Sequence, residues 1–133
     1  MARHQVADLF LDTVPFNGHS TATDALWCGL PVLTRIGKSF PGRVAASLLN
    51  AIGAPELITT TKEEYVRRAV ELAKDRSAHA ALKHKIRSNR LEAPLFDTAL
   101  YTRHLEWAFE EMHRRAVTGL ALDHIEVPAL VRD

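Results

Sequence analysis

The sequence predicts an α/β fold built on a short parallel sheet. Three short runs of apolar and β-branched residues, at 8–13, 31–36 and 56–59, have the composition of buried strands. Each run precedes a segment with the apolar spacing of a helix, and strands that alternate with helices pair in parallel. Because a three-stranded parallel sheet needs cover on both faces, we expect half of a larger doubly wound domain, followed by a helical C-terminal section.

The first strand-helix unit is predicted at residues 8–28. The apolar run 8–13 ends in the turn cluster Val14-Pro15-Phe16-Asn17-Gly18. Ser20 can cap a helix from Thr21 to Cys28, because its hydroxyl accepts hydrogen bonds from the free N–H groups of a first turn. A glycine and a proline then follow, which predicts that the helix ends there.

A second unit repeats this order. The strand 31–36 leads through the glycine-flanked loop 37–42 into a predicted helix from Arg43 to Ile52. Gly53 is a typical helix terminator, and a brief third strand follows at 56–59.

The remainder is predicted to be helical up to residue 117. The capping signals are Thr61 with Glu64 for a helix to Lys74, Ser77 for one to Arg90, and Asp97 or Thr98 for one to Val117. The last helix has an apolar repeat on one face, which predicts packing and no chemistry; its members are Tyr101, Leu105, Ala108, Phe109 and Met112. The tail 118–133 has no period, and we expect it to run extended over the surface.

Composition excludes several classes of function. With 17 basic and 16 acidic residues the formal charge is +1, so neither nucleic acid nor an anionic membrane is an expected partner. No run of about 18 apolar residues and no secretory signal is present. The single Cys28 excludes an intramolecular disulfide, and no His or Cys spacing predicts a metal. We therefore expect a cytoplasmic protein of one compact domain.

The segment Asn17–Asp24 is the candidate binding site. In parallel sheets ligands gather at the carboxyl ends of strands, where the next helix offers free N–H groups and a positive dipole end. An Asn-Gly turn, which can be left-handed, would bring the backbone close to a phosphate, and His19, Ser20 and Thr21 would add side-chain donors. Asp24, one turn further on, is placed to accept hydrogen bonds from a ribose.

The same residues are also typical of an ordinary helix start with a solvated histidine. Neither the P-loop signature nor the dinucleotide-binding glycine signature is present, so spacing alone leaves both interpretations open. Arg43 is likewise open: it could order the loop of the site or pair with an acid such as Glu56.

Motifs along nearly the whole chain resemble the C-terminal catalytic region of the O-GlcNAc transferase and SPINDLY family. These motifs are Leu11-Asp12-Thr13, Asn17-Gly18-His19-Ser20-Thr21, Asp24, Leu26-Trp27-Cys28-Gly29-Leu30-Pro31-Val32, Arg43-Val44-Ala45-Ala46-Ser47, Glu56-Leu57-Ile58, Glu64-Tyr65, Pro94-Leu95-Phe96-Asp97, Tyr101-Thr102 and Leu105-Glu106. The resemblance implies part of a Rossmann-like domain of a B-type glycosyltransferase fold. Residues 1–117 would form the second half of the C-terminal, donor-binding domain, and 118–133 a tail.

The resemblance also implies a ligand for each site residue. His19, Ser20 and Thr21 would contact the phosphates of a UDP-GlcNAc donor, and Asp24 its ribose. The pair Ser20-Thr21 stands where many relatives have two threonines, which keeps the hydroxyl. Arg3 stands where relatives often carry a basic or polar residue near the donor.

The implied reaction is an inverting transfer of a hexosyl group to Ser or Thr of a protein acceptor, with UDP as product and no metal. The family's other catalytic parts, an N-terminal Rossmann domain, a tetratricopeptide region and a donor-phosphate lysine, lie upstream in such enzymes. We therefore expect a fragment without catalytic residues that is inactive in isolation. SPINDLY relatives transfer fucose from GDP, so the resemblance leaves the sugar open.

Two other functions are compatible with the sequence. One is a stand-alone nucleotide-binding or dimerisation module, and we expect an unpaired strand edge at Leu9–Leu11 through which copies could associate. The other is a flavodoxin-like signalling receiver, which needs an acidic cluster after the first strand that Asp12 alone does not supply.

Overall fold

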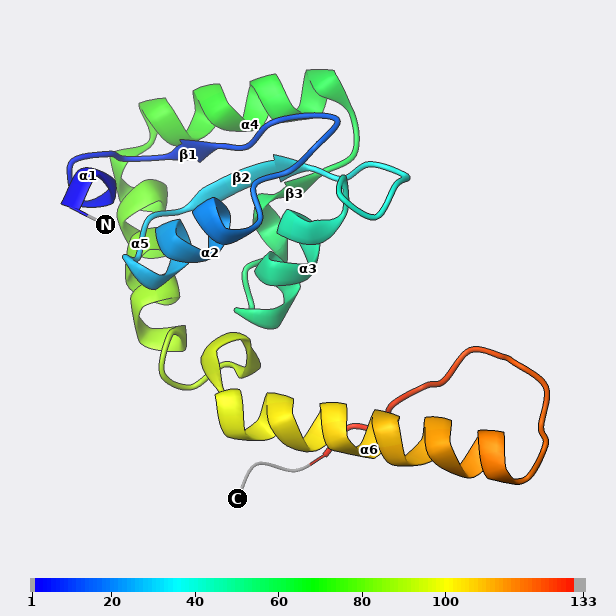
Figure 1. The fold of residues 1–133 in the computed structure, drawn as a ribbon. Coiled ribbons are helices and arrows are strands. Elements are labelled where there is room, and N and C mark those ends of the chain that lie inside the picture. Colours follow the sequence, from blue (N-terminus) through cyan, green and yellow to red (C-terminus); the bar gives the residue numbers. More distant parts are fainter. Residues whose placement is uncertain (1, 131–133) are drawn as a thin grey trace. The chain divides into compact units, whose positions relative to one another are not determined.

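The computed structural model describes residues 2–130 and divides the chain into two compact units. One unit extends to Leu95, and the second begins at Phe96. The first contains all the strands and five helices, and the second contains one long helix and the tail (Figure 1). The predicted division at residue 117 remains a prediction.

A three-stranded parallel sheet lies at the centre of the first unit, as predicted. Its strands are β1 Phe10–Leu11, β2 Val32–Arg35 and β3 Ile58–Thr59. Their order is β1-β2-β3, with Phe10 opposite Val32 and Thr34 opposite Ile58. The third strand begins two residues later than predicted, because residues 55–57 form a 3-10 turn, η1 Pro55–Leu57. Among the described residues β1 is an edge strand, as expected, and association through it stays a prediction.

Helices lie on both faces of this sheet (Figure 1). Their bounds are α1 Ala2–Gln5, α2 Ser20–Trp27, α3 Val44–Ala51, α4 Lys62–Lys74 and α5 Arg76–Asn89. Helix α4 lies on one face, and α2 and α3 lie on the other. Apolar side chains from the sheet and the helices form the fully buried core; the largest are Leu26, Leu33, Leu49, Ile52, Leu57 and Ile86.

Glycine ends α2 and α3, as the sequence predicts. Gly29 has a φ of +75°, and Leu30 N–H then reaches back 2.9 Å to the carbonyl of Ala25. Gly53 repeats the arrangement with a φ of +74°. A residue with a Cβ is strained at such φ values, so each glycine stabilises the turn that returns the chain to the sheet.

The predicted caps are confirmed for α4 and for the long helix but are wrong for α2 and α5. Thr61 Oγ1 accepts the Glu64 N–H at 3.1 Å, and Asp97 Oδ1 accepts the Leu100 N–H at 2.9 Å. Helix α5 begins one residue before Ser77, and the Asp75 carboxylate caps it. An aspartate two residues earlier thus supplies the acceptor that serine was expected to give.

At α2 the predicted cap, Ser20, is instead the first helical residue. His19 holds the N-cap position, and no side chain there accepts a hydrogen bond from the first turn. The first turn also carries no acidic residue. The helix therefore begins with N–H groups that the protein itself leaves without an intrahelical partner.

The second unit consists of α6 Thr98–Val117 and the tail, preceded by the 3-10 turn η2 Pro94–Phe96. The apolar stripe predicted to be packed is exposed: 65% of Tyr101, 57% of Phe109 and 49% of Met112 are accessible. Periodicity correctly predicts an amphipathic helix, but it carries no information on whether another element covers the apolar face.

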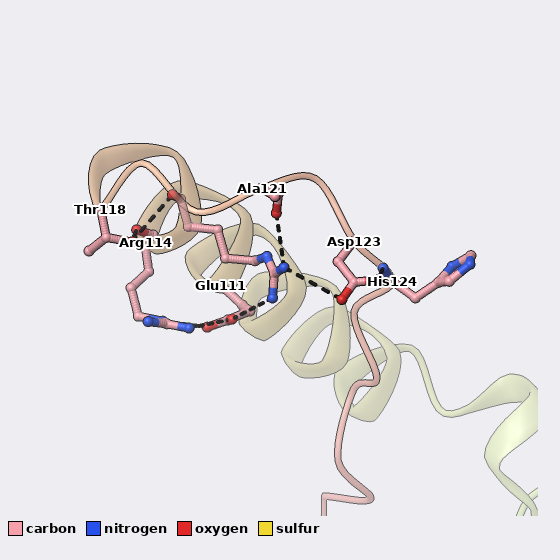
Figure 2. A network of polar contacts seen from close by, with 7 residues as sticks. Glu111, Arg114, Thr118, Ala121, Asp123 and His124 are labelled. Carbon is pink, nitrogen blue, oxygen red and sulfur yellow. Dashed lines mark hydrogen bonds and ion pairs between the residues drawn. The ribbon is translucent and has the colours of Figure 1, made fainter.

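The tail up to residue 130 has no regular secondary structure after Gly119 and returns along α6. Arg115 Nη2 donates to the Ala121 carbonyl at 3.0 Å and lies 3.9 Å from an Asp123 carboxylate oxygen. Figure 2 shows Ala121 and Asp123 on the tail where it passes beside α6. Further along, the Leu130 N–H donates to His104 Nε2 at 3.1 Å. Hydrogen bonds from Arg114 to Glu111 hold the pKa of that carboxyl below its usual range. Polar contacts thus fix the tail on one face of α6.

Candidate functional site

Helix α2 begins at the carboxyl end of β1, and the loop 12–19 connects them. The loop is fixed at its base by the carboxylate of Asp12, of which only 5% is exposed. Its Oδ1 accepts the Gly18 N–H at 2.6 Å, and its Oδ2 accepts the hydroxyl of Thr34 at 2.6 Å. One buried acid therefore joins the loop to the central strand.

Gly18 is required for space and not for a left-handed turn. It has no positive φ, so the predicted left-handed Asn-Gly conformation is wrong. A Cβ on Gly18 would lie 2.9 Å from Thr21 Oγ1 and 3.3 Å from Asp12 Oδ1. The glycine thus lets the loop approach both Asp12 and the start of α2.

Asn17 connects the site loop to the next one. Its Nδ2 donates to the Thr13 carbonyl at 2.9 Å, and its backbone N–H donates to the Pro41 carbonyl at 3.0 Å. Only 2% of the residue is exposed. The loop 37–42, which closes on itself through the Gly37 N–H and the Gly42 carbonyl at 2.7 Å, therefore lies beside the start of α2.

Two phenylalanine rings flank the imidazole of His19. The Phe16 ring stacks on it at 4.8 Å, and the Phe40 ring meets it edge-on at 6.3 Å. His19 Nε2 is buried and has no hydrogen-bond partner among the described residues. Ring contacts thus fix the imidazole in place, while this nitrogen keeps its hydrogen-bonding capacity unused.

The remaining predicted residues differ in position. Ser20 and Thr21 are exposed on the first turn of α2, and Asp24 follows one turn later, half-buried. Arg3 lies on α1, before β1, and no hydrogen bond or ion pair among the described residues joins it to the start of α2. The structure therefore brings His19, Ser20, Thr21 and Asp24 together on one helix start and leaves Arg3 apart from them.

Sequence reasoning overlooked the part of Asp12 and Tyr65 in this region. Tyr65, on α4, donates its hydroxyl to the Asp12 carbonyl at 3.0 Å. Burial, with a contribution from the negative charge of Asp12, raises the pKa of Tyr65. The sequence signal that could have identified Asp12 is an acidic residue directly after a buried strand, because such a residue lies at the carboxyl edge of a parallel sheet, where ligands bind.

The open question about Arg43 is partly settled. Glu56 forms its ion pair with Lys85, at 2.7 Å, and not with Arg43. Arg43 is exposed at the N-cap position of α3, next to the loop 37–42. A role in ordering that loop is the alternative that remains.

Two cavities lie in the first unit. One of about 510 Å³ is lined by Asp8, Leu9, Leu72, Ala73, Arg76 and His79. A second of about 310 Å³, mostly apolar, is lined by Val14, Arg35, Lys62, Tyr65 and Val66. Of the residues 12–24 around the candidate site, only Val14 lines either of these two cavities.

Residues 2–130 contain no cluster of three or more His, Cys, Asp or Glu side chains that could hold a metal ion. Within the same range no helix is long and apolar enough to cross a membrane.

A parallel sheet with helices on both faces places this unit in the class of α/β proteins, in which ligand sites gather at the carboxyl edge of the sheet. Within that class, residues 1–105 match glycosyl transferase family 41, and the chain belongs to this family.

Named relatives agree with this assignment. The chain is 41% identical over 123 residues to a UDP-N-acetylglucosamine–peptide N-acetylglucosaminyltransferase of Caenorhabditis elegans, covering 92% of this chain and 11% of that protein. It is 35% identical over 131 residues to a probable enzyme of the same name, SPINDLY, of Hordeum vulgare, covering 97% and 14%. The chain thus spans between 11% and 14% of the length of these relatives.

A solved structure has the same fold. A mutant O-GlcNAc transferase of Thermobaculum terrenum superimposes with a TM-score of 0.84 at 36% identity, covering 89% of this chain and 23% of the other. The short parallel sheet with helices is therefore the fold of this part of a glycosyltransferase, as the sequence predicts.

Proposed function

We propose that this chain supplies the diphosphate and ribose contacts for UDP in a UDP-GlcNAc:protein O-N-acetylglucosaminyltransferase. The observation that carries the proposal is the start of α2, which has neither a side-chain cap nor an acid in its first turn. Free N–H groups and the positive end of a helix dipole attract a phosphate. The names of the family-41 relatives supply the identity of the nucleotide sugar.

Four of the five predicted side chains have a part in this proposal, and Arg3 has none. Ser20 and Thr21 are exposed hydroxyls beside the free N–H groups, and they donate to phosphate oxygens. His19, fixed by Phe16 and Phe40, adds an imidazole donor. Asp24 accepts hydrogen bonds from the ribose hydroxyls one turn further along the helix.

Transfer itself needs more than this surface. The acceptor hydroxyl, the anomeric carbon of the sugar and the leaving diphosphate must be held together, which accounts for many orders of magnitude in rate. The contacts proposed above hold only the diphosphate and the ribose of the donor. We therefore propose that the 133-residue chain binds UDP but does not transfer the sugar by itself, and that the acceptor protein and the other catalytic regions complete the enzyme.

The proposal is tested by calorimetric titration of UDP into the purified chain. We expect saturable binding that His19→Ala and Asp24→Ala each weaken, because each removes a contact to the ligand. Asp75→Ala is the matched control, since it removes an acid from another helix start. It should lower stability and leave UDP affinity unchanged.

A parallel titration with GDP addresses the nucleotide. Tighter binding of UDP than of GDP supports UDP-GlcNAc as the donor. Tighter binding of GDP would instead indicate a guanine nucleotide sugar at the same site. Absence of saturable binding for both nucleotides would contradict the proposed site. A stand-alone nucleotide-binding or dimerisation module would then have to be tested by other ligands and by oligomeric state.

A further inference from the structure

The ligand-binding start of α2 is held in position by a residue that lies beneath it. Asp12 is buried, and both of its carboxylate oxygens are engaged, one by Gly18 and one by Thr34. Burying a carboxylate is costly unless hydrogen bonds compensate it. Two hydrogen bonds of 2.6 Å supply that compensation and at the same time join the loop to the sheet.

The Gly18 N–H is consequently not available to a ligand. It points to Asp12 Oδ1, two residues before α2 begins. The free N–H groups for a phosphate are therefore those of the first turn of α2, and Asp12 determines where that turn begins.

The sheet side of the arrangement is equally constrained. Thr34 is fully buried on β2, and its hydroxyl donates to Asp12 Oδ2 at 2.6 Å. Tyr65 of α4 donates to the Asp12 carbonyl from a third direction. Asp12 thus receives hydrogen bonds from β2, from α4 and from the loop that leads to α2.

We infer that Asp12 is a positioning residue of the proposed UDP site, which acts through Gly18 on the start of α2 and does not touch the ligand. The identity of the ligand in this inference rests on the proposed function. The way in which Asp12 acts is argued from the hydrogen bonds of Asp12 alone. It predicts that the shape of the residue at position 12, and not its charge, determines UDP affinity.

The test compares three variants by UDP titration and by the amide signal of Gly18 in a ¹H–¹⁵N spectrum. Asp12→Ala leaves the Gly18 N–H without its acceptor, so UDP affinity should fall about tenfold or more. Asp12→Asn keeps an acceptor for Gly18 and a donor for Thr34 Oγ1, so affinity should stay within about threefold of the parent chain. The Gly18 signal should move in both variants.

Thr59→Val is the matched control for a merely structural effect. It removes a buried hydrogen bond of the same sheet, which the Thr59 hydroxyl donates to the backbone carbonyl of Thr34 at 2.9 Å, and none of the hydrogen bonds found for Thr59 in the described part of the chain is with the loop 12–19. We expect lower stability with unchanged UDP affinity and an unchanged Gly18 signal. If Thr59→Val weakened UDP binding as much as Asp12→Ala, or if Asp12→Asn failed as Asp12→Ala does, the positioning role would be overturned.

The test also covers two other outcomes: a variant that does not fold, and a parent chain that does not bind UDP. Where Asp12→Ala does not fold, Thr34→Val removes one of the two carboxylate contacts and should weaken UDP binding and shift the Gly18 signal. Where the parent chain binds no UDP, the proposed function fails. The Gly18 signal of the ligand-free variants still decides the role of Asp12, because an unchanged signal in Asp12→Asn and Thr34→Val would contradict it.

Discussion

Helices α2 and α4 both begin where a strand of the same parallel sheet ends, yet their first turns differ. At α4 the Thr61 hydroxyl caps the helix, and Glu63 and Glu64 place negative charge on the first turn. At α2 the N-cap residue is His19, with no capping hydrogen bond and no acid. A phosphate would complete the α2 start but would be repelled at α4, so position at the sheet edge alone does not make an anion site.

The largest expected effect comes from adding to the first turn of α2 the negative charge that the first turn of α4 already carries. Thr21→Glu places a carboxylate on the first turn, where it repels a diphosphate, and UDP affinity should fall about 100-fold. Ser77→Glu makes the same change at the second residue of the capped helix α5 and should not affect binding. Equal UDP affinities of the two variants, measured by calorimetry, would contradict the difference between the helix starts.

A second effect concerns the space around Gly18. Gly18→Ala forces a Cβ to within 2.9 Å of Thr21 Oγ1, and we expect it to lower the free energy of unfolding by about 1–3 kcal/mol. Adding Thr21→Ala should recover part of this loss, because the crowding atom is then removed. Urea denaturation measures both, and a neutral Gly18→Ala would show that the loop tolerates a side chain.

A third effect is the difference in stability loss between removing a hydroxyl that caps a helix and removing one that does not. Thr61→Ala should lower the free energy of unfolding by about 1 kcal/mol, because it removes the acceptor for the Glu64 N–H. Ser20→Ala should cost less than about 0.5 kcal/mol, because Ser20 is not a cap. Similar losses in thermal unfolding would mean that the α2 start is capped in solution.

The smallest effect is the pH dependence at α4. Hydrogen bonds from the backbone and the hydroxyl of Thr60 to Glu64 lower the pKa of that carboxyl below 4.5. Because the folded pKa lies below the unfolded one, its stabilisation is present above pH 4.5 and is lost as the pH falls through the folded value. NMR titration of the carboxyl should show the lowered pKa, and Glu64→Gln should reduce the acid-induced loss of stability. A carboxyl that titrates at 4.5 would contradict these hydrogen bonds.

The sequence predicts most of the fold because its local signals and its tertiary structure agree. Helix-ending glycines such as Gly29 and Gly53 act within one helical turn. The residues predicted to form β2 are mostly apolar because that strand is buried. The predicted cap Ser20 was wrong because whether a hydroxyl caps a helix depends on the conformation of the preceding loop, which Asp12 fixes from a distance.

The site is predicted less completely, for a similar reason. Residue type and order place His19, Ser20, Thr21 and Asp24 on one helix start. The contacts that shape it, from Asp12 to Thr34 and from Asn17 to the Pro41 carbonyl, join residues more than 20 positions apart. Such pairs leave no periodic signal in a single sequence.

The most direct test of the central claim is the amide spectrum of the chain during a UDP titration. We predict saturable shifts of the Ser20, Thr21 and Ala22 amides, the first N–H groups of α2, and no shifts of the Lys62, Glu63 and Glu64 amides at the start of α4. Shifts confined to α4, or no saturable shift at α2, would contradict the proposal that the start of α2 binds the diphosphate.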